Sequence, residues 1–319
     1  MRLCRFRHNG QVQIGLYDEA QIVPLAAGAR AYADATHEEL NLSASEDLLD
    51  FLPPEGRAFA AARKLAEWVA RSDGKLPKTA TVPTSTVSLL VPIPRPNKLF
   101  LLAGNYAKHI EEGGGIAAER SATFPYVFMK PATTTLTDPG QPVHIPSVSP
   151  YAIDWEVELA VVMGKRVKGI GEEDALKAVA GYSVVNDISN RKFRPNPSRK
   201  TREKDVFFDW LHGKWHDSFC PCGPCITSAD AISDPQKLDL QLRLNGQVKQ
   251  DASTAEQVFP VAAVIAFISS ICTLEPGDII STGTPDGVGH ASGTYLKAGD
   301  TLEASIATIG TLRSPVVDA

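Results

Sequence analysis

The stretch Asp154-Trp-Glu-Val-Glu-Leu-Ala-Val-Val162 joins two acidic residues to an apolar run. The run predicts a strand over residues 157–164, and the spacing of Glu156 and Glu158 then directs both carboxylates to one face. Neighbouring carboxylates repel and raise each other's pKa, so keeping both ionised near a core requires a compensating cation. The pair therefore predicts a metal site, and an edge strand with a solvated acidic face is the alternative.

A second acidic position follows another apolar run. Residues 182–187 read as a strand that ends on Asp187, within Asn186-Asp187-Ile-Ser-Asn-Arg191. Three carboxylates are hard oxygen donors, which fit Mg²⁺, Mn²⁺ or Ca²⁺ better than Zn²⁺. Such a site would keep open positions for water and substrate.

Upstream, Gly104-Asn-Tyr-Ala-Lys-His109-Ile-Glu-Glu112 predicts a short helical turn that three glycines end. His109 and Glu112 are three residues apart and therefore share one face. A carboxylate beside an imidazole orients it and raises its pKa, which produces a general base for activating water. An ordinary ion pair on a surface helix is the alternative, and the glycines would permit lid motion.

Two lysines and one loop could bind an anion. Lys214 lies among aromatic residues and Lys130 ends the apolar strand 126–130. Either could bind a carboxylate or extend to the surface. Residues 280–289 form a strand running into a glycine-rich loop, which would expose backbone N–H groups to a small anion. The loop lacks the GKT/S ending of a phosphate loop.

The segment Cys220-Pro-Cys222-Gly-Pro-Cys225, with His212 and His216 upstream, imitates both a zinc cluster and a thiol redox site. A redox CxxC lies at a helix N-terminus, yet the residues that follow look extended. Structural zinc usually takes its ligands from two separated knuckles. We therefore favour small buried hydrophobic side chains.

Composition excludes some functions and leaves others. The chain has 319 residues, a net charge of −5 and a pI near 5.8, which argues against nucleic-acid binding and leaves small anionic substrates open. The N-terminus lacks the apolar stretch of a secretory signal, and the apolar run 258–272 is too short to span a membrane. Five cysteines do not suggest a disulfide framework, so we expect the cytoplasm.

The periodicity of the chain changes near Pro94, where we place a domain boundary. Before it, residues 1–45 predict a few strands, 45–70 a helical region that Pro53 and Pro54 interrupt, and 72–96 an extended segment. Beyond it the pattern is mainly β, with helices at 172–180 and 259–271. The expected strands beyond the boundary cover residues 99–103, 126–130, 157–164, 182–187, 238–244 and 278–282.

Seven motifs occur in a characteristic order: GNYAKHIEE, YVFMKP, DWEVELAVVMGK, VVNDISNRK, LHGKWHDSFCPCGP, LRLNGQ and LEPGDIISTGTPDGVG. Together they resemble the catalytic domain of the fumarylacetoacetate hydrolase family. The resemblance implies an α+β, mainly β fold: a rolled mixed β-sheet catalytic domain over residues 94–319 and a small N-terminal α+β domain over 1–93. It also implies a homodimer.

The resemblance assigns roles to single residues. It implies one Mg²⁺ or Mn²⁺, with Ca²⁺ possible, bound by Glu156, Glu158 and Asp187. The family's HxxE dyad falls on His109 and Glu112, where the histidine generates hydroxide from water. The remaining positions are the active-site lysine Lys214, the substrate-contacting Arg191, and the pocket residues Tyr106, Lys130, Gly283 and Thr284.

The implied reaction is hydrolysis of a C–C bond in a small 2-oxo or β-diketo acid of the acylpyruvate or fumarylpyruvate type, as in aromatic catabolism. The cation would stabilise an enolate, and Lys214 would steady developing charge. Isomerisation, decarboxylation or hydration of a related 2-oxo or 2-hydroxymuconate-type acid is the alternative, and a non-catalytic binding protein is a further one. The basic and aromatic stretch 192–210 departs from the family pattern, and we expect it to reshape the pocket rim or a subunit contact.

Overall fold

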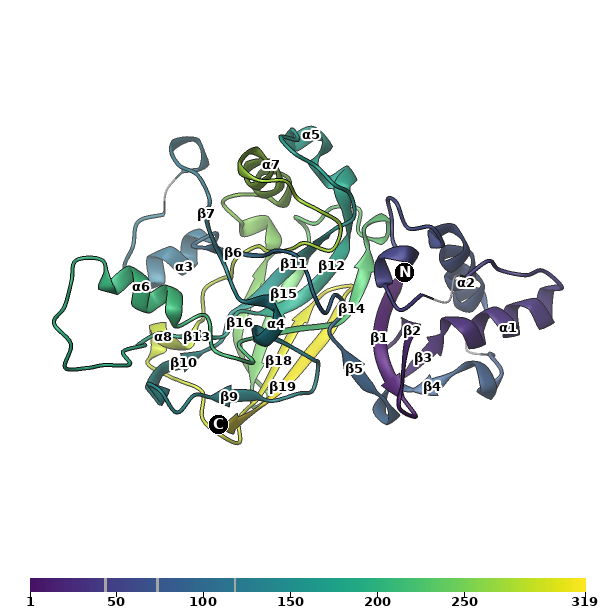
Figure 1. The fold of residues 1–319 in the computed structure, drawn as a ribbon, viewed down its shortest axis with the longest axis horizontal. Coiled ribbons are helices and arrows are strands. Elements are labelled where there is room, and N and C mark those ends of the chain that lie inside the picture. The colour runs from purple at the N-terminus through teal and green to yellow at the C-terminus, as the bar shows by residue number, and fades with distance from the viewer. Residues whose placement is uncertain (43–44, 73–74, 118) are drawn as a thin grey trace.

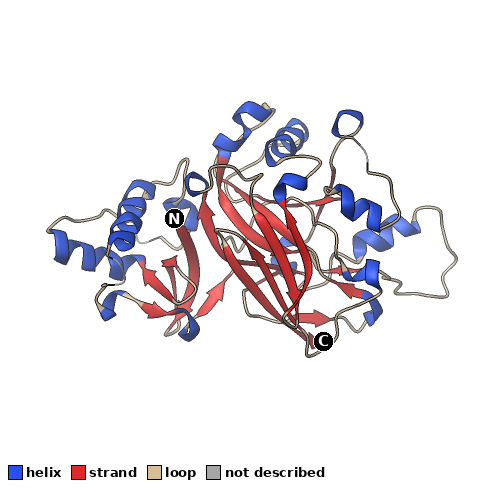
Figure 2. Cartoon of the chain, turned by 180° about the vertical axis from the view of Figure 1, so that it is seen from behind, coloured by secondary structure: helices blue, strands red, loops and turns tan. Residues whose placement is uncertain are grey.

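Two packed β-sheets form the centre of the computed structural model, which describes residues 1–42, 45–72, 75–117 and 119–319 (Figures 1 and 2). Within these residues, the larger sheet contains β1 (Arg2–His8), β2 (Gln11–Tyr17), β3 (Gln21–Pro24), β4 (Val82–Pro83), β5 (Ser88–Leu90), β6 (Leu99–Ala103), β7 (Tyr126–Met129), β8 (Leu136–Thr137), β11 (Val157–Met163), β12 (Val179–Asn186), β14 (Cys220–Ser228) and β17 (Ile279–Ser281). The smaller sheet contains β9 (Val143–Ile145), β15 (Asp239–Leu244), β16 (Gln247–Ser253), β18 (Thr301–Ile306) and β19 (Gly310–Asp318). A separate pair consists of β10 (Ile153–Asp154) and β13 (Ser189–Asn190).

The strand β11 lies inside the larger sheet and is buried along its whole length. It pairs antiparallel with β12 and β17, whereas β17 pairs parallel with β6, so the predicted mixed sheet is confirmed. Val157, Leu159 and Val161 pack in the core that includes the smaller sheet, while Ala160 and Val162 pack in the core on the opposite face. Because side chains alternate along a strand, Glu158 shares the face of Ala160 and Val162.

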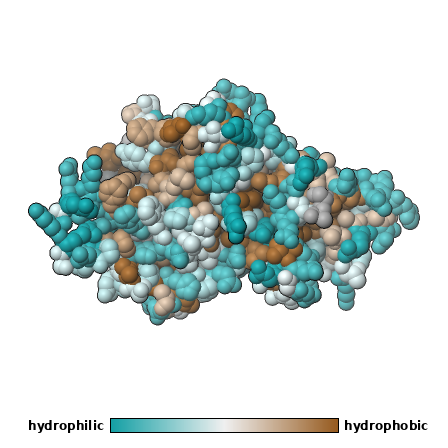
Figure 3. All heavy atoms as spheres, viewed as in Figure 1, coloured by the Kyte–Doolittle hydropathy of each residue, from teal (hydrophilic) through white to brown (hydrophobic). Residues whose placement is uncertain are grey.

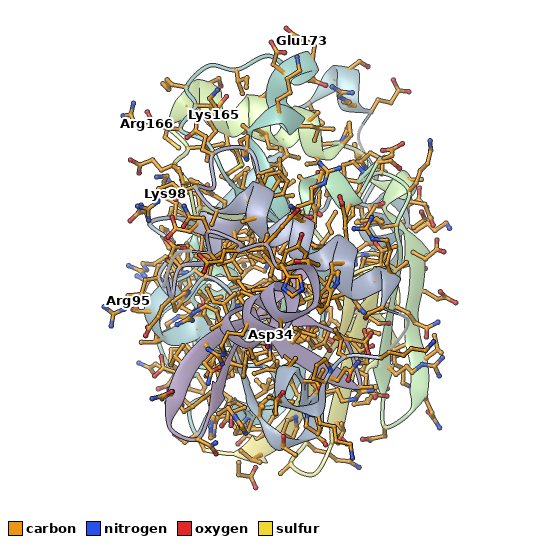
Figure 4. The ribbon with its side chains drawn as sticks, turned by 90° about the vertical axis from the view of Figure 1, so that its right-hand side faces the viewer. Asp34, Arg95, Lys98, Lys165, Arg166 and Glu173 are labelled. Carbon is orange, nitrogen blue, oxygen red and sulfur yellow. The ribbon has the colours of Figure 1, made fainter. Side chains whose placement is uncertain are left out.

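The N-terminal part adds strands to the same sheet. β1 pairs antiparallel with β14, and β2, β3 and β4 follow in order beyond β1. Two helices cover these strands, α1 (Leu25–Thr36) and α2 (Phe59–Arg71), together with the 3₁₀ turns η1 (Leu48–Phe51), η2 (Lys78–Ala80) and η3 (Thr84–Thr86). Figure 4 views this part face on, with Asp34 of α1 near the centre. The domain boundary near Pro94 stays a prediction.

The prediction for residues 1–45 was incomplete because it included no helix. α1 buries Leu25, Gly28, Ala31 and Tyr32 at helical spacing. Its other residues are mostly alanines, which favour a helix but produce a weak hydrophobic period. The helical prediction for 45–70 is confirmed by η1 and α2. Residues 43–44, and residues 73–74 of the predicted extended segment, lie outside the described residues.

The remaining helices are α3 (Ala107–Glu112), α4 (Ala132–Thr135), α5 (Glu172–Ala175), α6 (Asp205–His212), α7 (Val261–Ile271) and α8 (Gly289–Ser292), with 3₁₀ turns η4 (Arg120–Ala122), η5 (Pro150–Ala152), η6 (Leu176–Ala178), η7 (Ala229–Ala231) and η8 (Thr254–Glu256). α7 confirms the predicted helix 259–271, and α5 with η6 confirms most of 172–180. α6 forms inside the basic and aromatic stretch. α3, α6 and α8 lie at the end of the molecule opposite α1 and α2 (Figure 1). None of the described helices is long and apolar enough to cross a membrane.

Replacing Leu159 by alanine should destabilise the protein, because this fully buried side chain joins β11 to the core between the sheets. The expected loss is about 2–5 kcal/mol of the free energy of unfolding. Urea unfolding monitored by tryptophan fluorescence measures it. The control V248A changes an apolar side chain that is 43% exposed and should shift the value by less than about 0.5 kcal/mol. Equal stability of the two variants would contradict this packing.

Candidate metal centre

Three carboxylates converge at one end of β11. Glu156 precedes the strand, Glu158 is its second residue, and Asp187 directly follows β12. Val157 pairs with Asn186, and the Asp187 N–H donates to the Glu156 carbonyl at 2.8 Å. One oxygen from each of the three carboxylates lies within 4.8 Å of the others, and all three residues are buried. A central, buried β11 excludes the solvated edge strand considered from sequence.

Glu158 has an oxygen without a protein partner. Its Oε2 accepts hydrogen bonds from the Ser281 hydroxyl at 2.6 Å and the Gly283 N–H at 2.9 Å. Its Oε1 is buried and has no hydrogen-bond partner among the described residues. Burial, together with the charges of Asp187 and Glu156, raises the pKa of Glu158 well above its usual value. An unpartnered oxygen and surplus negative charge fit a divalent cation, and the all-carboxylate donor set suits Mg²⁺ or Mn²⁺.

Two cations compensate part of this negative charge. Lys214 Nζ donates to Glu156 Oε2 at 2.8 Å and to Asp187 Oδ2 at 2.5 Å, and Arg191 pairs with Glu156. Burial alone would raise the pKa of Glu156, but Arg191 and Lys214 outweigh it and lower the pKa to about 2. Burial alone would lower the pKa of Lys214, but Asp187 and Glu156 raise it above its usual value. Both groups are therefore charged at neutral pH.

Lys130 is a third cation, and it is fully enclosed. Its Nζ donates to the carbonyls of Ile188 at 3.0 Å and Phe219 at 2.5 Å, and it pairs with Asp187. The two carbonyl contacts are hydrogen bonds, and the contact with Asp187 is an ion pair. Lys130 thus holds a predicted metal ligand in place, and its predicted contact with substrate stays a prediction.

The His109–Glu112 pair borders a pocket. His109 Nδ1 lies 2.8 Å from Glu112 Oε1, and Glu112 Oε2 accepts the Gly287 N–H at 2.9 Å. Burial raises the pKa of Glu112, but the bonds from His109 and Gly287 outweigh it and leave the pKa below its usual value. The pocket has a volume of about 420 Å³ and is also lined by Arg191 and His290. Arg191 also pairs with Glu156, so one lining residue of this pocket contacts the carboxylate cluster.

The glycine-rich loop after β17 binds carboxylates of the protein itself. The Gly283 N–H donates to Glu158, and the Gly287 N–H donates to Glu112. Gly287 has a φ of +91°, and a Cβ there would lie 2.0 Å from the Lys249 carbonyl oxygen, so only glycine fits. The sequence indicated that the loop's N–H groups bind an anion, and within the described residues these N–H groups meet side-chain carboxylates.

Two further predicted pocket residues are enclosed by the fold. Tyr106 is 1% exposed, and its hydroxyl accepts a hydrogen bond from Gln257 Nε2 at 3.4 Å. Burial raises its pKa above the usual range. The Thr284 hydroxyl donates to the Val157 carbonyl at 3.0 Å and accepts from Gln250 Nε2 at 2.8 Å. The substrate-binding roles of Tyr106, Gly283 and Thr284 stay predictions.

Asp154 also belongs to this site, and its role was not predicted from the sequence. It is fully buried and lies two residues before Glu156. Its carboxylate accepts hydrogen bonds from Arg191 and from the backbone at the start of α8. The regular spacing of acids at 154, 156 and 158 was the available signal, although the structure places Asp154 in β10 and Glu158 in β11.

The cysteine-rich segment forms β14, and Cys220, Cys222 and Cys225 are free and buried in it. Burial raises the pKa of the Cys222 and Cys225 thiols to about 12. Burial also raises the pKa of the Cys220 thiol well above its usual value. Thiolate chemistry needs a lowered pKa, so these side chains act as small buried hydrophobic groups.

Two parts of the chain match known protein families. Residues 98–317 match the family described as fumarylacetoacetate (FAA) hydrolase C-terminal, and residues 1–49 match the family described as Rv2993c-like, N-terminal. The chain is 40% identical over 236 residues to the mitochondrial oxaloacetate tautomerase fahd2 of Xenopus laevis, covering 73% of this chain and 69% of that protein. It is 34% identical over 320 residues to the 2,4-didehydro-3-deoxy-L-rhamnonate hydrolase of Sphingomonas sp. (strain SKA58), covering 99% and 96%.

Solved structures resemble the whole chain. The maleylpyruvate hydrolase from Sphingobium sp. SYK-6, in complex with manganese (II) ion and pyruvate, has a TM-score of 0.70 and 29% identity, with both chains fully covered. The fumarylacetoacetate hydrolase of psychrophilic Exiguobacterium antarcticum has a TM-score of 0.72 and 27% identity, again with full coverage. The Mn²⁺ in the first of these structures agrees with a divalent metal site at the three carboxylates.

Glu158→Gln should abolish stabilisation by metal without unfolding the protein, because the amide preserves the side chain's shape while removing charge from the mutually repelling acids. For the wild type, Mn²⁺ at 100 times its dissociation constant should add about 2.7 kcal/mol of stability. Thermal unfolding with Mn²⁺ and with a chelator measures the difference. The control E303Q changes an exposed pair on β18 and should keep the shift. A wild-type shift in E158Q would contradict the site.

Proposed function

The chain belongs to the fumarylacetoacetate hydrolase family, and we propose that it is a metal-dependent hydrolase cleaving a C–C bond in a small 2-oxo or β-diketo acid. The acylpyruvate and fumarylpyruvate types are the expected substrates. One observation carries the proposal: the His109–Glu112 dyad lines a pocket together with Arg191, and Arg191 pairs with Glu156 of the buried carboxylate triad. The relative that holds Mn²⁺ together with pyruvate, a 2-oxo acid, supports it.

Glu156, Glu158 and Asp187 would hold Mg²⁺ or Mn²⁺, with Ca²⁺ as a further candidate. The ion would supply Lewis acidity toward the carboxylate and oxo oxygens of the substrate. Because the pKa of Glu112 lies below its usual value, this group remains a carboxylate and fixes the His109 ring through Nδ1. The other ring nitrogen, Nε2, is then free to take a proton from a water molecule in the pocket.

The cations of the site would act on charge that develops in the substrate. Lys214 stays protonated between Glu156 and Asp187, where it can stabilise a developing oxyanion. Arg191 is 12% exposed and lines the pocket, so it can also contact a substrate carboxylate. These roles extend the ion pairs that the two side chains already form.

The second candidate is isomerisation or tautomerisation of a related 2-oxo acid. The 40% identity to an oxaloacetate tautomerase favours it, and the same buried cation site could stabilise the enolate of either reaction. The hydrolase relative covers nearly the whole chain, and the intact dyad can activate water, so hydrolysis remains first. Decarboxylation and hydration rank below both. A binding protein without catalysis would have no use for mutually repelling buried acids.

Replacing Glu156 or Asp187 by alanine should abolish both metal binding and turnover, because each substitution removes one predicted ligand and one of the two anionic partners of the buried Lys214. Metal content of the purified variants and turnover with added Mn²⁺ measure the two effects. Full activity in a metal-free variant would refute the assignment.

His109→Gln should keep metal binding and lower hydrolysis by about 10²–10⁴-fold, the usual contribution of a positioned general base. The assay panel comprises acylpyruvates, fumarylpyruvate, hydroxymuconate-type acids and oxaloacetate, with products identified. Two products from one acid indicate hydrolysis, whereas interconversion without cleavage would support the second candidate. Unchanged hydrolysis in H109Q would contradict the dyad.

We further propose that the chain forms a homodimer through an apolar face. Phe124, Tyr126, Phe207, Phe267 and Ile271 line an apolar pocket of about 560 Å³ together with Trp210 of α6. Figure 3 shows hydrophobic atoms gathered over β7 and α7 on this face. β7 ends the main path of the large sheet, so its outer edge is also open to pairing. A second copy of the chain would cover the apolar pocket and the edge of β7. In that dimer α6 would form the subunit contact that was predicted for the stretch 192–210.

The double variant F207E/I271E should convert a dimer into a monomer, because both side chains are more than half exposed on this face. Light scattering after size exclusion measures the mass, and 34.3 kDa corresponds to one chain. The control V248E places a charge on β16, outside the apolar face. A monomeric wild type at micromolar concentration would overturn the dimer.

The cytoplasm remains the expected compartment. The five cysteines are free and four of them are buried, as a reducing environment allows. Several relatives carry the word mitochondrial in their names. The matrix is also a compartment where thiols can remain reduced, so localisation of the tagged chain would decide between the two.

A further inference from the structure

We propose that Asp154 is a positioning residue that joins the two halves of the site, the metal ligands and the His109–Glu112 dyad. It acts through Arg191 on Glu156 and through the loop before α8 on Glu112. The inference rests on the proposed function for its catalytic meaning. Its contacts are independent of which reaction the site performs.

The carboxylate of Asp154 is saturated by hydrogen bonds. Its Oδ1 accepts from the N–H groups of Trp155 at 2.8 Å and Gly289 at 2.6 Å. Its Oδ2 accepts from the His290 N–H at 3.0 Å and from Arg191 Nε at 2.8 Å. Each oxygen therefore accepts two hydrogen bonds, the number that a carboxylate oxygen usually accepts.

Saturation distinguishes Asp154 from the predicted ligands beside it. Residues 154, 156 and 158 are spaced two apart, but Asp154 ends β10, which pairs with β13, whereas Glu158 lies in β11. Among the described residues, the cluster able to hold a metal contains Glu156, Glu158 and Asp187 and does not contain Asp154. Glu158 keeps a free oxygen for a cation, whereas Asp154 has none. The chain thus places Asp154, which positions other groups, next to the two predicted metal ligands Glu156 and Glu158.

Arg191 transmits the position of Asp154 to a predicted metal ligand. Its Nε donates to Asp154 and its Nη2 pairs with Glu156 Oε1. The guanidinium group is planar and rigid, so holding one carboxylate fixes where it meets the other. If Asp154 loses its charge, Arg191 keeps one buried anionic partner and can rotate toward it. Glu156 would then lose a defined orientation.

The backbone of residues 287–290, which leads into the first turn of α8, transmits the position of Asp154 to the dyad. Gly289 and His290 donate to Asp154, and Gly287, two residues earlier, donates to Glu112 Oε2 at 2.9 Å. The Trp155 side chain also donates to the Gly287 carbonyl at 3.1 Å. A Cβ on Gly289 would lie 2.6 Å from Asp154 Oδ1, so the close approach needs glycine. Movement of this loop would therefore shift Glu112, which orients His109.

Asp154→Asn is the direct test, because the amide preserves size but replaces one acceptor by a donor. We expect the dissociation constant for Mn²⁺, measured by calorimetry on the full chain, to rise about 10- to 100-fold, as for other residues that support ligands. Amide hydrogen exchange without metal should quicken in residues 287–290 and in α3. At saturating Mn²⁺ the turnover number should remain below that of the wild type.

Asp278→Asn is the matched control. Asp278 is equally buried, pairs with Lys98 and accepts the N–H groups of Lys98 and Glu275. Figure 4 shows Lys98 along the same outer edge as Arg95, Lys165 and Arg166. This variant should lose stability but keep Mn²⁺ affinity and slow exchange in residues 287–290. Equal effects of both variants on the site would reduce Asp154 to a general structural role and overturn the inference.

Arg191→Lys provides a second test in case D154N does not fold. Lysine keeps the charge but lacks the rigid fork, so Mn²⁺ affinity should still fall about tenfold or more. Wild-type affinity in D154N or in R191K would overturn the link to Glu156, and unchanged exchange in α3 of D154N would overturn the link to the dyad. A wild type that binds no Mn²⁺ would refute the proposed function instead, and the exchange experiment would still decide the loop contacts.

Discussion

The site is organised by an excess of buried negative charge. Four buried carboxylates, those of Asp154, Glu156, Glu158 and Asp187, lie together with Lys130, Lys214 and Arg191. Buried charges persist only when other charges or hydrogen bonds compensate them. Three cations cannot neutralise four acids, and the remaining charge appears as the raised pKa of Glu158. A divalent cation would also compensate this buried negative charge, so the stability of the protein and its metal affinity are linked at Glu158.

The surrounding fold supplies hydrogen-bond donors to these acids. β12 delivers Asp187 beside Glu156, and the end of β17 delivers Ser281 and Gly283 to Glu158. The glycines that follow let the backbone approach closely enough to donate to Glu112 and Asp154. One continuous segment thus contacts three acids, Asp154 and Glu158 in one stretch of the chain and Glu112 in α3. Backbone amides are fixed dipoles, so they support these acids without further side-chain entropy loss.

The arrangement also explains why relatives of this chain carry different activities. The relatives include hydrolases and tautomerases on one fold. Both kinds of reaction pass through an enolate-like charge next to a carboxylate, which a cation and nearby lysine or arginine can stabilise. Hydrolysis additionally requires an activated water, and under the proposed function the His109–Glu112 pair would activate it. Family membership therefore indicates shared chemistry and leaves the exact reaction open.

The sequence alone determined the local features: the buried β11 with its paired glutamates, the acid that ends β12, the dyad on one helical turn and the mainly β fold. These follow from spacings of two, three and four residues, which local geometry controls. α1 was missed because alanines produce little hydrophobic period. Only the tertiary structure decided that Lys130 and Gly283 contact predicted metal ligands and that Asp154 accepts a hydrogen bond from Gly289, 135 positions away. Such contacts depend on sheet register and loop path, because partners distant in sequence meet only after the strands have paired.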